Sequence, residues 1–125
     1  MTEAIEVMRK RADFLAANTG LRNAGPGFVL LTRPNDTGAT RFGITVTRKI
    51  GNAVVRNRMK RRLRELLRAH LPTEGLPGHD HVLIGRDRGI ERDFGALRED
   101  LLAALAKARA GKGDPRRPRN RRPRR

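Results

Sequence analysis

The strongest constraint on the fold is an apolar stripe in residues 53–71. Apolar side chains recur there at spacings of three and four residues, the period that places them on one face of an α-helix. The stripe consists of Val55, Met59, Leu63, Leu66 and Leu67. Another layer of the protein must cover such a stripe. We therefore predict a helix over residues 53–71 that packs on a sheet and that ends at Pro72, because proline disrupts helices.

The face opposite this stripe is cationic. At about 100° per residue, the outward positions are those of Asn57, Lys60, Arg61, Arg64 and Arg68, with Arg58 and Arg62 flanking them. A helix of this length spans roughly 27 Å at 1.5 Å per residue, enough to follow several phosphates. The pattern therefore indicates a surface for an extended polyanion and not for a point ligand.

The excess of positive charge is confined to two segments. The chain has 29 Lys and Arg against 13 Asp and Glu, so its net charge is 29 − 13 = +16. Residues 41–68 carry +9 of this charge and residues 112–125 carry +7. Charge of one sign concentrated in this way destabilises a compact fold unless a polyanion neutralises it. Nucleic acid is favoured over an anionic membrane, because no stripe of Trp, Phe or Leu accompanies the basic tail.

The remaining patterns predict a small α+β fold. A short helix over residues 9–18 would close with Gly20 in a left-handed cap. The other predicted elements are strands over residues 28–32, 41–47 and 81–85 and a helix over residues 94–110. Turn residues at 34–38 favour direct antiparallel pairing of the first two strands. We expect an α/β sandwich, with a small mixed sheet and helices packed on one of its faces.

The chain is predicted to form one domain followed by a tail. Residues 1–111 can make one modest core, whereas the Arg/Pro-rich residues 112–125 lack apolar side chains other than proline and are expected to be disordered. Cysteine is absent, which suits a reducing cytosol. No segment approaches the roughly 20 apolar residues that span a bilayer. A cytoplasmic protein without membrane contact is therefore expected.

No residue pattern indicates a catalytic or metal site within the chain. His79 and His81 lie two residues apart, His70 is distant, and no thiolate is available, so we predict no metal site. Glu99 and Asp100 are adjacent and would point apart on a helix. The remaining acids of this region resemble loop and capping groups, namely Asp87, Glu91 and Asp93. A nuclease site of clustered carboxylates is not supported.

A family resemblance is carried by residues 47–68, TRKIGNAVVRNRMKRRLRELLR. This run resembles the signature of the bacterial ribonuclease P protein component. Arg56, Asn57 and Arg58 match its Arg-Asn-Arg motif, and Lys60 and Arg61 follow as in the family. The resemblance extends more weakly over residues 9 to about 108, with the Arg-rich tail outside it.

The resemblance implies a ribosomal protein S5 domain 2-like sandwich with a left-handed βαβ crossover, contrary to the usual handedness. It implies that the motif helix binds the catalytic RNA of a 1:1 ribonucleoprotein in which the protein is monomeric. The RNA subunit, with bound Mg²⁺, would cleave precursor tRNA, so that the protein holds no tight cofactor and no catalytic residue. The implied RNA-subunit-binding residues are Lys49, Arg56, Asn57, Arg58, Lys60, Arg61, Arg64 and Arg68.

The resemblance also implies a cleft between the first helix and the sheet that holds the 5′ leader of precursor tRNA. Phe14 would stack on an unpaired base, an interaction of about 1 to 3 kcal/mol per base, with Phe42 assisting if it faces the cleft. Asn18 and Leu31 stand where aromatic residues occur in other members. The implied leader-binding residues are Phe14, Leu31, Val46 and Arg48.

Three other classes remain open at this point. A ribosomal or ribosome-assembly protein is also small and basic with Arg-rich tails, and the RNA that copurifies would distinguish it. A protein-only nuclease would cleave precursor tRNA with magnesium but without RNA. A DNA-binding helix module is disfavoured, because Gly51 and Asn52 join the cationic helix to a strand and not to another helix. We therefore expect RNA, and not DNA, as the partner.

Overall fold

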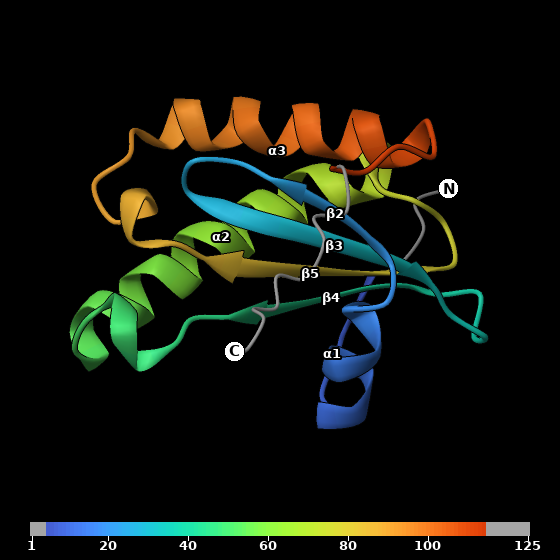
Figure 1. Ribbon diagram of the computed structural model, residues 1–125, viewed down its shortest axis with the longest axis horizontal. Coiled ribbons are helices and arrows are strands. Elements are labelled where there is room, and N and C mark those ends of the chain that lie inside the picture. Colours follow the sequence, from blue (N-terminus) through green and yellow to red (C-terminus); the bar gives the residue numbers. More distant parts are fainter. Residues whose placement is uncertain (1–4, 115–125) are drawn as a thin grey trace, which may run out of the picture.

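The computed structural model describes residues 5–114 and contains a mixed sheet with helices on both faces (Figure 1). Two long helices, α2 and α3, cover one face, and the short helix α1 lies on the other. The strands are β1 (Ile5–Val7), β2 (Leu21–Ala24), β3 (Phe28–Pro34), β4 (Thr40–Thr45) and β5 (His79–Gly85). The helices are α1 (Arg11–Ala17), α2 (Ala53–Glu74) and α3 (Phe94–Arg109), with 3₁₀ turns η1 (Arg48–Ile50) and η2 (Asp87–Gly89).

The strand order is β1-β4-β5-β3-β2, so β5 inserts between β3 and β4. It pairs antiparallel with β3, where Phe28 lies opposite Gly85, and parallel with β4, where Phe42 lies opposite His81. The predicted direct pairing of residues 28–32 with 41–47 is therefore wrong. The turn residues at 34–38 report only on the local chain. The strand that separates β3 from β4 is β5, which comes some 35 residues later in the sequence.

The connection from β4 through α2 to β5 is a crossover between adjacent parallel strands. In Figure 1 both strands run toward the left, β5 lies above β4, and α2 passes behind the sheet. This arrangement makes the crossover left-handed, as the resemblance implied and against the usual preference. Because β4 and β5 are parallel, α2 begins beyond the edge of the sheet at which both strands end.

Helix α2 is longer than predicted because tertiary packing extends it beyond Pro72. Asn52 caps its start, with its side-chain oxygen accepting a hydrogen bond of 3.0 Å from the Val55 N–H. At the other end the Gly75 N–H donates to the carbonyl of Leu71, whose side chain is buried in the core. The prediction that Pro72 ends the helix is wrong, because burial of the Leu71 side chain stabilises the last turn.

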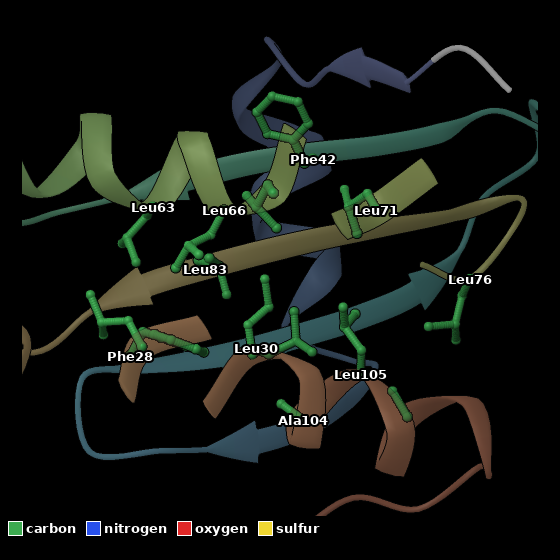
Figure 2. Close-up of a cluster of buried hydrophobic side chains, with 14 of the residues drawn as sticks. Phe28, Leu30, Phe42, Leu63, Leu66, Leu71, Leu76, Leu83, Ala104 and Leu105 are labelled. Atoms are coloured by element: carbon green, nitrogen blue, oxygen red, sulfur yellow. The ribbon is translucent and has the colours of Figure 1, made fainter. Parts of the chain in front are cut away.

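The main core lies between the sheet and helices α2 and α3 (Figure 2). It holds Phe28, Leu30 and Phe42 from the sheet, together with apolar residues of both helices. A smaller cluster of Met8, Val29, Leu31, Val82 and Ala17 lies on the opposite face, where Phe14 packs against it. The prediction that the helices share one face is therefore wrong for α1.

The end of α1 also differs from expectation. Gly20 does not adopt a positive φ. The helix ends at Ala17, and Asn18 still has right-handed helical geometry. Gly20 is needed for a different reason, since a Cβ there would lie 1.9 Å from the carbonyl oxygen of Thr32. The prediction of a left-handed cap is wrong, and close backbone approach explains the glycine.

Strands β1 and β2 were not predicted because they are short. The β2 sequence is LRNA, which has no extended alternation of apolar residues. Its pairing with β3 places Asn23 opposite Leu30 on the side covered by α3. Lys112 and Asp114, which the prediction placed at the start of the tail, hydrogen-bond to β2. Residues 115–125 of the predicted tail lie outside the described residues.

A buried polar network joins the start of β5 to β4. Arg41 donates two hydrogen bonds, of 2.7 and 2.8 Å, to the carboxylate of Asp80, which also accepts from Asn35 at 2.8 Å. Burial alone would raise the pKa of Asp80, but the hydrogen bonds from Arg41 and Asn35 outweigh it and lower that pKa. The Asp80 carboxylate is therefore stabilised as an anion inside the fold.

His81 is fully buried and links two segments. Its Nε2 accepts from the Leu76 N–H at 3.0 Å, which requires Nδ1 to carry the proton and to donate to the Arg41 carbonyl at 3.0 Å. Burial lowers the pKa of His81 to about 4. The neutral ring is therefore the form that the fold requires.

Acid is expected to destabilise the protein through His81. The unfolded chain takes up a proton near pH 6.5, whereas the folded one does so only near pH 4. The contribution of neutral His81 to the free energy of unfolding should therefore be fully present above pH 6.5. It should be lost as the pH falls to 4, and the loss should be at most about 3 kcal/mol. Urea unfolding at several pH values measures this decline. The variant His81→Asn has no titrating group at this position and should show a much smaller decline; an equal decline would contradict the assignment.

None of the helices in residues 5–114 combines the length and the apolar character that a membrane crossing requires.

Candidate nucleic-acid interface

The outward face of α2 gathers most of the predicted cations. Arg58, Arg61, Arg64 and Arg68 are exposed, as is Asn57, and Lys60 is half-buried at the border of this face. The predicted outward orientation is confirmed for the exposed side chains, but Lys60 lies closer to the sheet than predicted. Within residues 5–114 none of these cations takes part in an ion pair. Their charges are therefore not neutralised by the described part of the fold.

Arg56 does not share this face. It lies three residues before Met59 and seven before Leu63, both buried, so it belongs to the side of the helix that faces the sheet. Its side chain is half-buried. Arg56, which the resemblance implied to bind RNA with the other motif cations, therefore does not lie on the outward face. Arg56 and Arg58 diverge because a separation of two residues turns the helix by about 200°.

Val54 is a residue of this surface that the sequence reasoning missed. Its side chain is 76% exposed and lies one turn before Arg58 and two turns before Arg61. The sequence reasoning assigned it to neither face of the helix. The helical spacing could have identified it, because positions four and seven residues apart share one face.

Arg68 and the turn before α2 extend the cationic surface. The guanidinium of Arg68 lies 5.7 Å from the centre of the Phe42 ring, within the range of a cation–π contact. Arg48 and Lys49 are exposed in η1, whose Ile50 packs against the main core. The predicted residues Lys49 and Arg68 therefore lie at the two ends of the surface.

Arg62 has an internal role. It donates to the carbonyls of Gly89 and Ile90, both at 3.3 Å, and to that of Arg92. Its guanidinium also lies 5.9 Å from the Phe94 ring centre. These contacts hold the η2 segment against α2. Arg62 is thus a structural residue within a cationic helix.

Replacing Arg62 with alanine is expected to destabilise the protein, because three carbonyls would lose a charged donor. We expect a loss of about 2 kcal/mol in the free energy of unfolding. The matched variant Arg61→Ala removes the same charge one residue away from an exposed position, and it should change stability by less than about 0.5 kcal/mol. Urea denaturation of both variants measures the difference; equal stabilities would show that the Arg62 contacts are unimportant.

The predicted leader-binding residues are divided between the two faces of the sheet. Phe14 and Leu31 lie together on the α1 face, but Leu31 is buried. Val46 packs against the main core on the α2 face, so its placement beside Phe14 was wrong. Phe42 also faces the main core and cannot assist Phe14. Arg48 is exposed just beyond β4.

Gly43 provides the seat of the Phe14 ring. A Cβ at position 43 would lie 2.4 Å from the ring, so only glycine allows this contact. Asp13 lies 3.4 Å from the Arg41 guanidinium and ties the same helix to β4. Together these contacts fix α1, and with it the half-buried Phe14, over the sheet.

The substitution Gly43→Ala is expected to displace Phe14 and α1. Overpacking of this kind costs about 1 to 3 kcal/mol of stability, and the displaced ring should bind a single-stranded leader less well. The matched control is Gly25→Ala, where the nearest atom to an added Cβ is 3.6 Å away. Thermal unfolding and leader binding by each variant test this expectation. A Gly43 variant that matches the Gly25 variant in both measurements would contradict it.

Among residues 5–114, no three His, Asp or Glu side chains come together in a way that could hold a metal ion. The buried acid Asp80 is engaged by Arg41, and Asp100 is engaged by Arg92 at 2.7 Å. The described residues thus offer an exposed cationic helix, a half-buried aromatic ring and no cluster of acids. These features define a small α+β protein that binds a polyanion through side-chain charge.

Comparisons with known proteins identify the family within this class. The Ribonuclease P family model matches residues 3–109. A ribonuclease P protein component from Erythrobacter litoralis is 69% identical over 97% of this chain and all of its own length. The solved ribonuclease P protein of Thermotoga maritima is 36% identical, with a TM-score of 0.71 over 80% of this chain and 94% of its own. The solved ribonuclease P protein of Staphylococcus aureus is 30% identical, with a TM-score of 0.69 over 82% of this chain and 94% of its own.

The chain therefore belongs to the bacterial ribonuclease P protein family, and the predicted fold class is confirmed.

Proposed function

We propose that the outward face of α2 binds the catalytic RNA of ribonuclease P and that the α1 face binds the 5′ leader of precursor tRNA. The observation that carries this proposal is the set of exposed, unpaired cations on α2, described above. Arginine can take two phosphate oxygens in one plane, whereas lysine acts as a flexible point charge. A mixed surface of this kind supplies both orientation and affinity for RNA.

Binding of the leader would favour precursor over product. Only the precursor carries the single strand, so any free energy gained from that strand is absent after cleavage. Phe14 supports this role because its ring is half-buried and fixed over Gly43. Arg48 would contact leader phosphates from the exposed turn after β4. Leu31 would act indirectly, as part of the cluster on which Phe14 rests.

The chemistry is proposed to reside in the RNA. Hydrolysis would be performed by the RNA subunit with Mg²⁺ that it mainly holds itself, and the acids of the described residues are committed to ion pairs and caps or are scattered. The protein would neutralise phosphate charge, so that RNA segments approach at lower magnesium. We propose a monomeric protein in a 1:1 complex, located in the cytoplasm, where a chain without cysteine is suited to reducing conditions.

Reconstitution tests the proposal. The chain is added to a bacterial ribonuclease P RNA at low magnesium, and cleavage of precursor tRNA is measured against the RNA alone. Stimulation of cleavage is the expected result. The protein without RNA should not cleave, and cleavage by the protein alone would instead indicate a protein nuclease. Recovery of ribosomal RNA with the tagged chain, without ribonuclease P RNA, would favour a ribosomal role.

A further inference from the structure

Three consecutive cations stand at the start of α1. Arg9 and Lys10 precede the helix and Arg11 is its first residue, and all three side chains are exposed. We refer to these three residues as the basic triplet. None of them takes part in an ion pair within residues 5–114. Adjacent like charges repel one another, so the fold gains no stability from the charges of the triplet.

Other cations of the α1 face are used within the fold. Arg22 forms an ion pair of 3.5 Å, and the guanidinium of Arg33 donates to the Thr19 hydroxyl at 3.2 Å. Arg41 is paired with two acids, one of which is Asp13 of α1. The basic triplet differs from these residues, because its charges remain available for a partner outside the described part of the chain.

The backbone fixes the position of the triplet. Met8, the residue before it, is buried on the α1 face and donates its N–H to the Phe42 carbonyl at 2.7 Å. At the other end the Lys10 carbonyl accepts from the Asp13 N–H at 3.0 Å, in the first turn of α1. The triplet therefore belongs to a short segment that is tied to the sheet on one side and to α1 on the other.

The triplet lies beside the seat of Phe14. An added Cβ at Gly43, the residue under the Phe14 ring, would lie 3.4 Å from the Cβ of Met8, so the chain passes this seat one residue before Arg9. Arg11 precedes Phe14 by three residues on the same helix, a rise of about 4.5 Å. In Figure 1 the start of α1 lies beyond β4, on the opposite side of the molecule from α3. A single strand with one base stacked on Phe14 can therefore place its next phosphates on the triplet.

The path of a leader over this face has a direction. The turn η1, with the exposed Arg48 and Lys49, follows β4 and precedes α2, so it joins the two proposed RNA surfaces. A leader that leaves the cleavage site in an RNA subunit bound to α2 therefore meets η1 first, then the Phe14 ring, and then the start of α1. The triplet thus lies on the far side of Phe14 from the cleavage site.

We propose that the basic triplet binds phosphates of the leader nucleotides that lie farther from the cleavage site than the base stacked on Phe14. This inference rests on the proposed leader binding and adds to it a site for the distal part of the strand. Arginine and lysine side chains that neutralise phosphates contribute affinity without reading the sequence. The site therefore accepts any leader that is long enough to reach it, and it favours long leaders over short ones.

The experiment uses holoenzyme reconstituted from the full chain and a ribonuclease P RNA. It measures the dissociation constants of precursor tRNAs whose leaders are shortened stepwise from the 5′ end, and of leaderless tRNA. The triplet variant carries Arg9→Gln, Lys10→Gln and Arg11→Gln. The control variant removes the same total charge from exposed positions elsewhere, with Arg98→Gln, Lys107→Gln and Lys112→Gln. Thermal unfolding verifies that both variants are folded.

With a long leader, the triplet variant should bind precursor about tenfold more weakly than the unaltered holoenzyme. The slope of log K against log salt should fall in magnitude by about 2, at roughly 0.7 for each of three contacts with a single strand. The loss should disappear as the leader is shortened, whereas the loss caused by Phe14→Leu should persist to shorter leaders. Leaderless tRNA binding and assembly with the RNA subunit should change less than about twofold.

Four results would overturn the proposal. The first is the absence of a loss with a long leader. The second is an equal loss at every leader length or in assembly with the RNA subunit, which would place the triplet on other RNA. The third is an equal loss for the control variant, since net charge alone would then determine the affinity. The fourth is a triplet effect that persists to shorter leaders than the Phe14 effect, because the proposed order would be reversed. If the unaltered holoenzyme does not prefer precursor over leaderless tRNA, the proposed leader binding fails instead.

Discussion

Replacing Arg58 and Arg61 together with alanine is expected to weaken binding of the protein to ribonuclease P RNA about a hundredfold or more. Both side chains are exposed on the outward face of α2 and lack ion-pair partners among the described residues. Each hydrogen bond to a charged group contributes about 1.5 to 3 kcal/mol, so the loss of two accounts for this factor. Stability should hardly change, since neither side chain is buried.

The control for this variant is the pair Arg98→Ala and Lys107→Ala on α3. These substitutions remove the same total charge from exposed positions on a different helix. Binding is measured by titration at several salt concentrations. The α2 pair should also lower the slope of log K against log salt by about 2, one for each phosphate contact. If the two pairs weaken binding equally, net charge and not the face of α2 determines the affinity.

Replacing Asp80 with alanine is expected to reduce the free energy of unfolding by about 3 kcal/mol, because Arg41 would lose its buried partner. The Asp80 side chain is 3% exposed and that of Arg41 17%, so water cannot readily replace the lost hydrogen bonds. The Asn35 side chain would lose an acceptor as well. Urea denaturation at pH 7 measures the change.

The companion variant Asp13→Ala removes the second acid that faces Arg41. The Asp13 carboxylate lies 3.4 Å from the Arg41 guanidinium and its side chain is 30% exposed, so it is more distant and more exposed than Asp80. Its expected cost is below about 1 kcal/mol. Adding Arg41→Met to Asp80→Ala should restore part of the lost stability, since the uncompensated charge is then gone. Equal costs for the two acids would mean that the Arg41–Asp80 pair has no special role.

The arginines of α2 do not all have the same role, so loss of RNA binding does not have the same meaning at each position. Arg62 holds the η2 segment through backbone carbonyls, and Arg56 is half-buried on the sheet side of the helix. Loss of RNA binding after substitution of either residue could therefore come from a change in the fold. Arg58, Arg61 and Arg64 are the positions at which a loss of affinity reports on the surface itself.

Much of the candidate site was predictable from local sequence. The apolar period of residues 53–71 determines which side chains of α2 face the sheet, and the cations between them then face outward. The run of residues 47–68 also carried the family resemblance. Both inferences succeeded because helical periodicity and a contiguous motif depend only on residues close together in the chain.

What the sequence by itself determined was therefore the set of major elements, the buried stripe of α2 and the family. The tertiary structure alone decided that β5 separates β3 from β4 and that Arg41 and Arg62 are used internally. It also decided that Asp114 fastens the chain to β2. The physical reason is that strand pairing and the choice of a charge's partner depend on contacts between residues far apart in the chain, which no local pattern records.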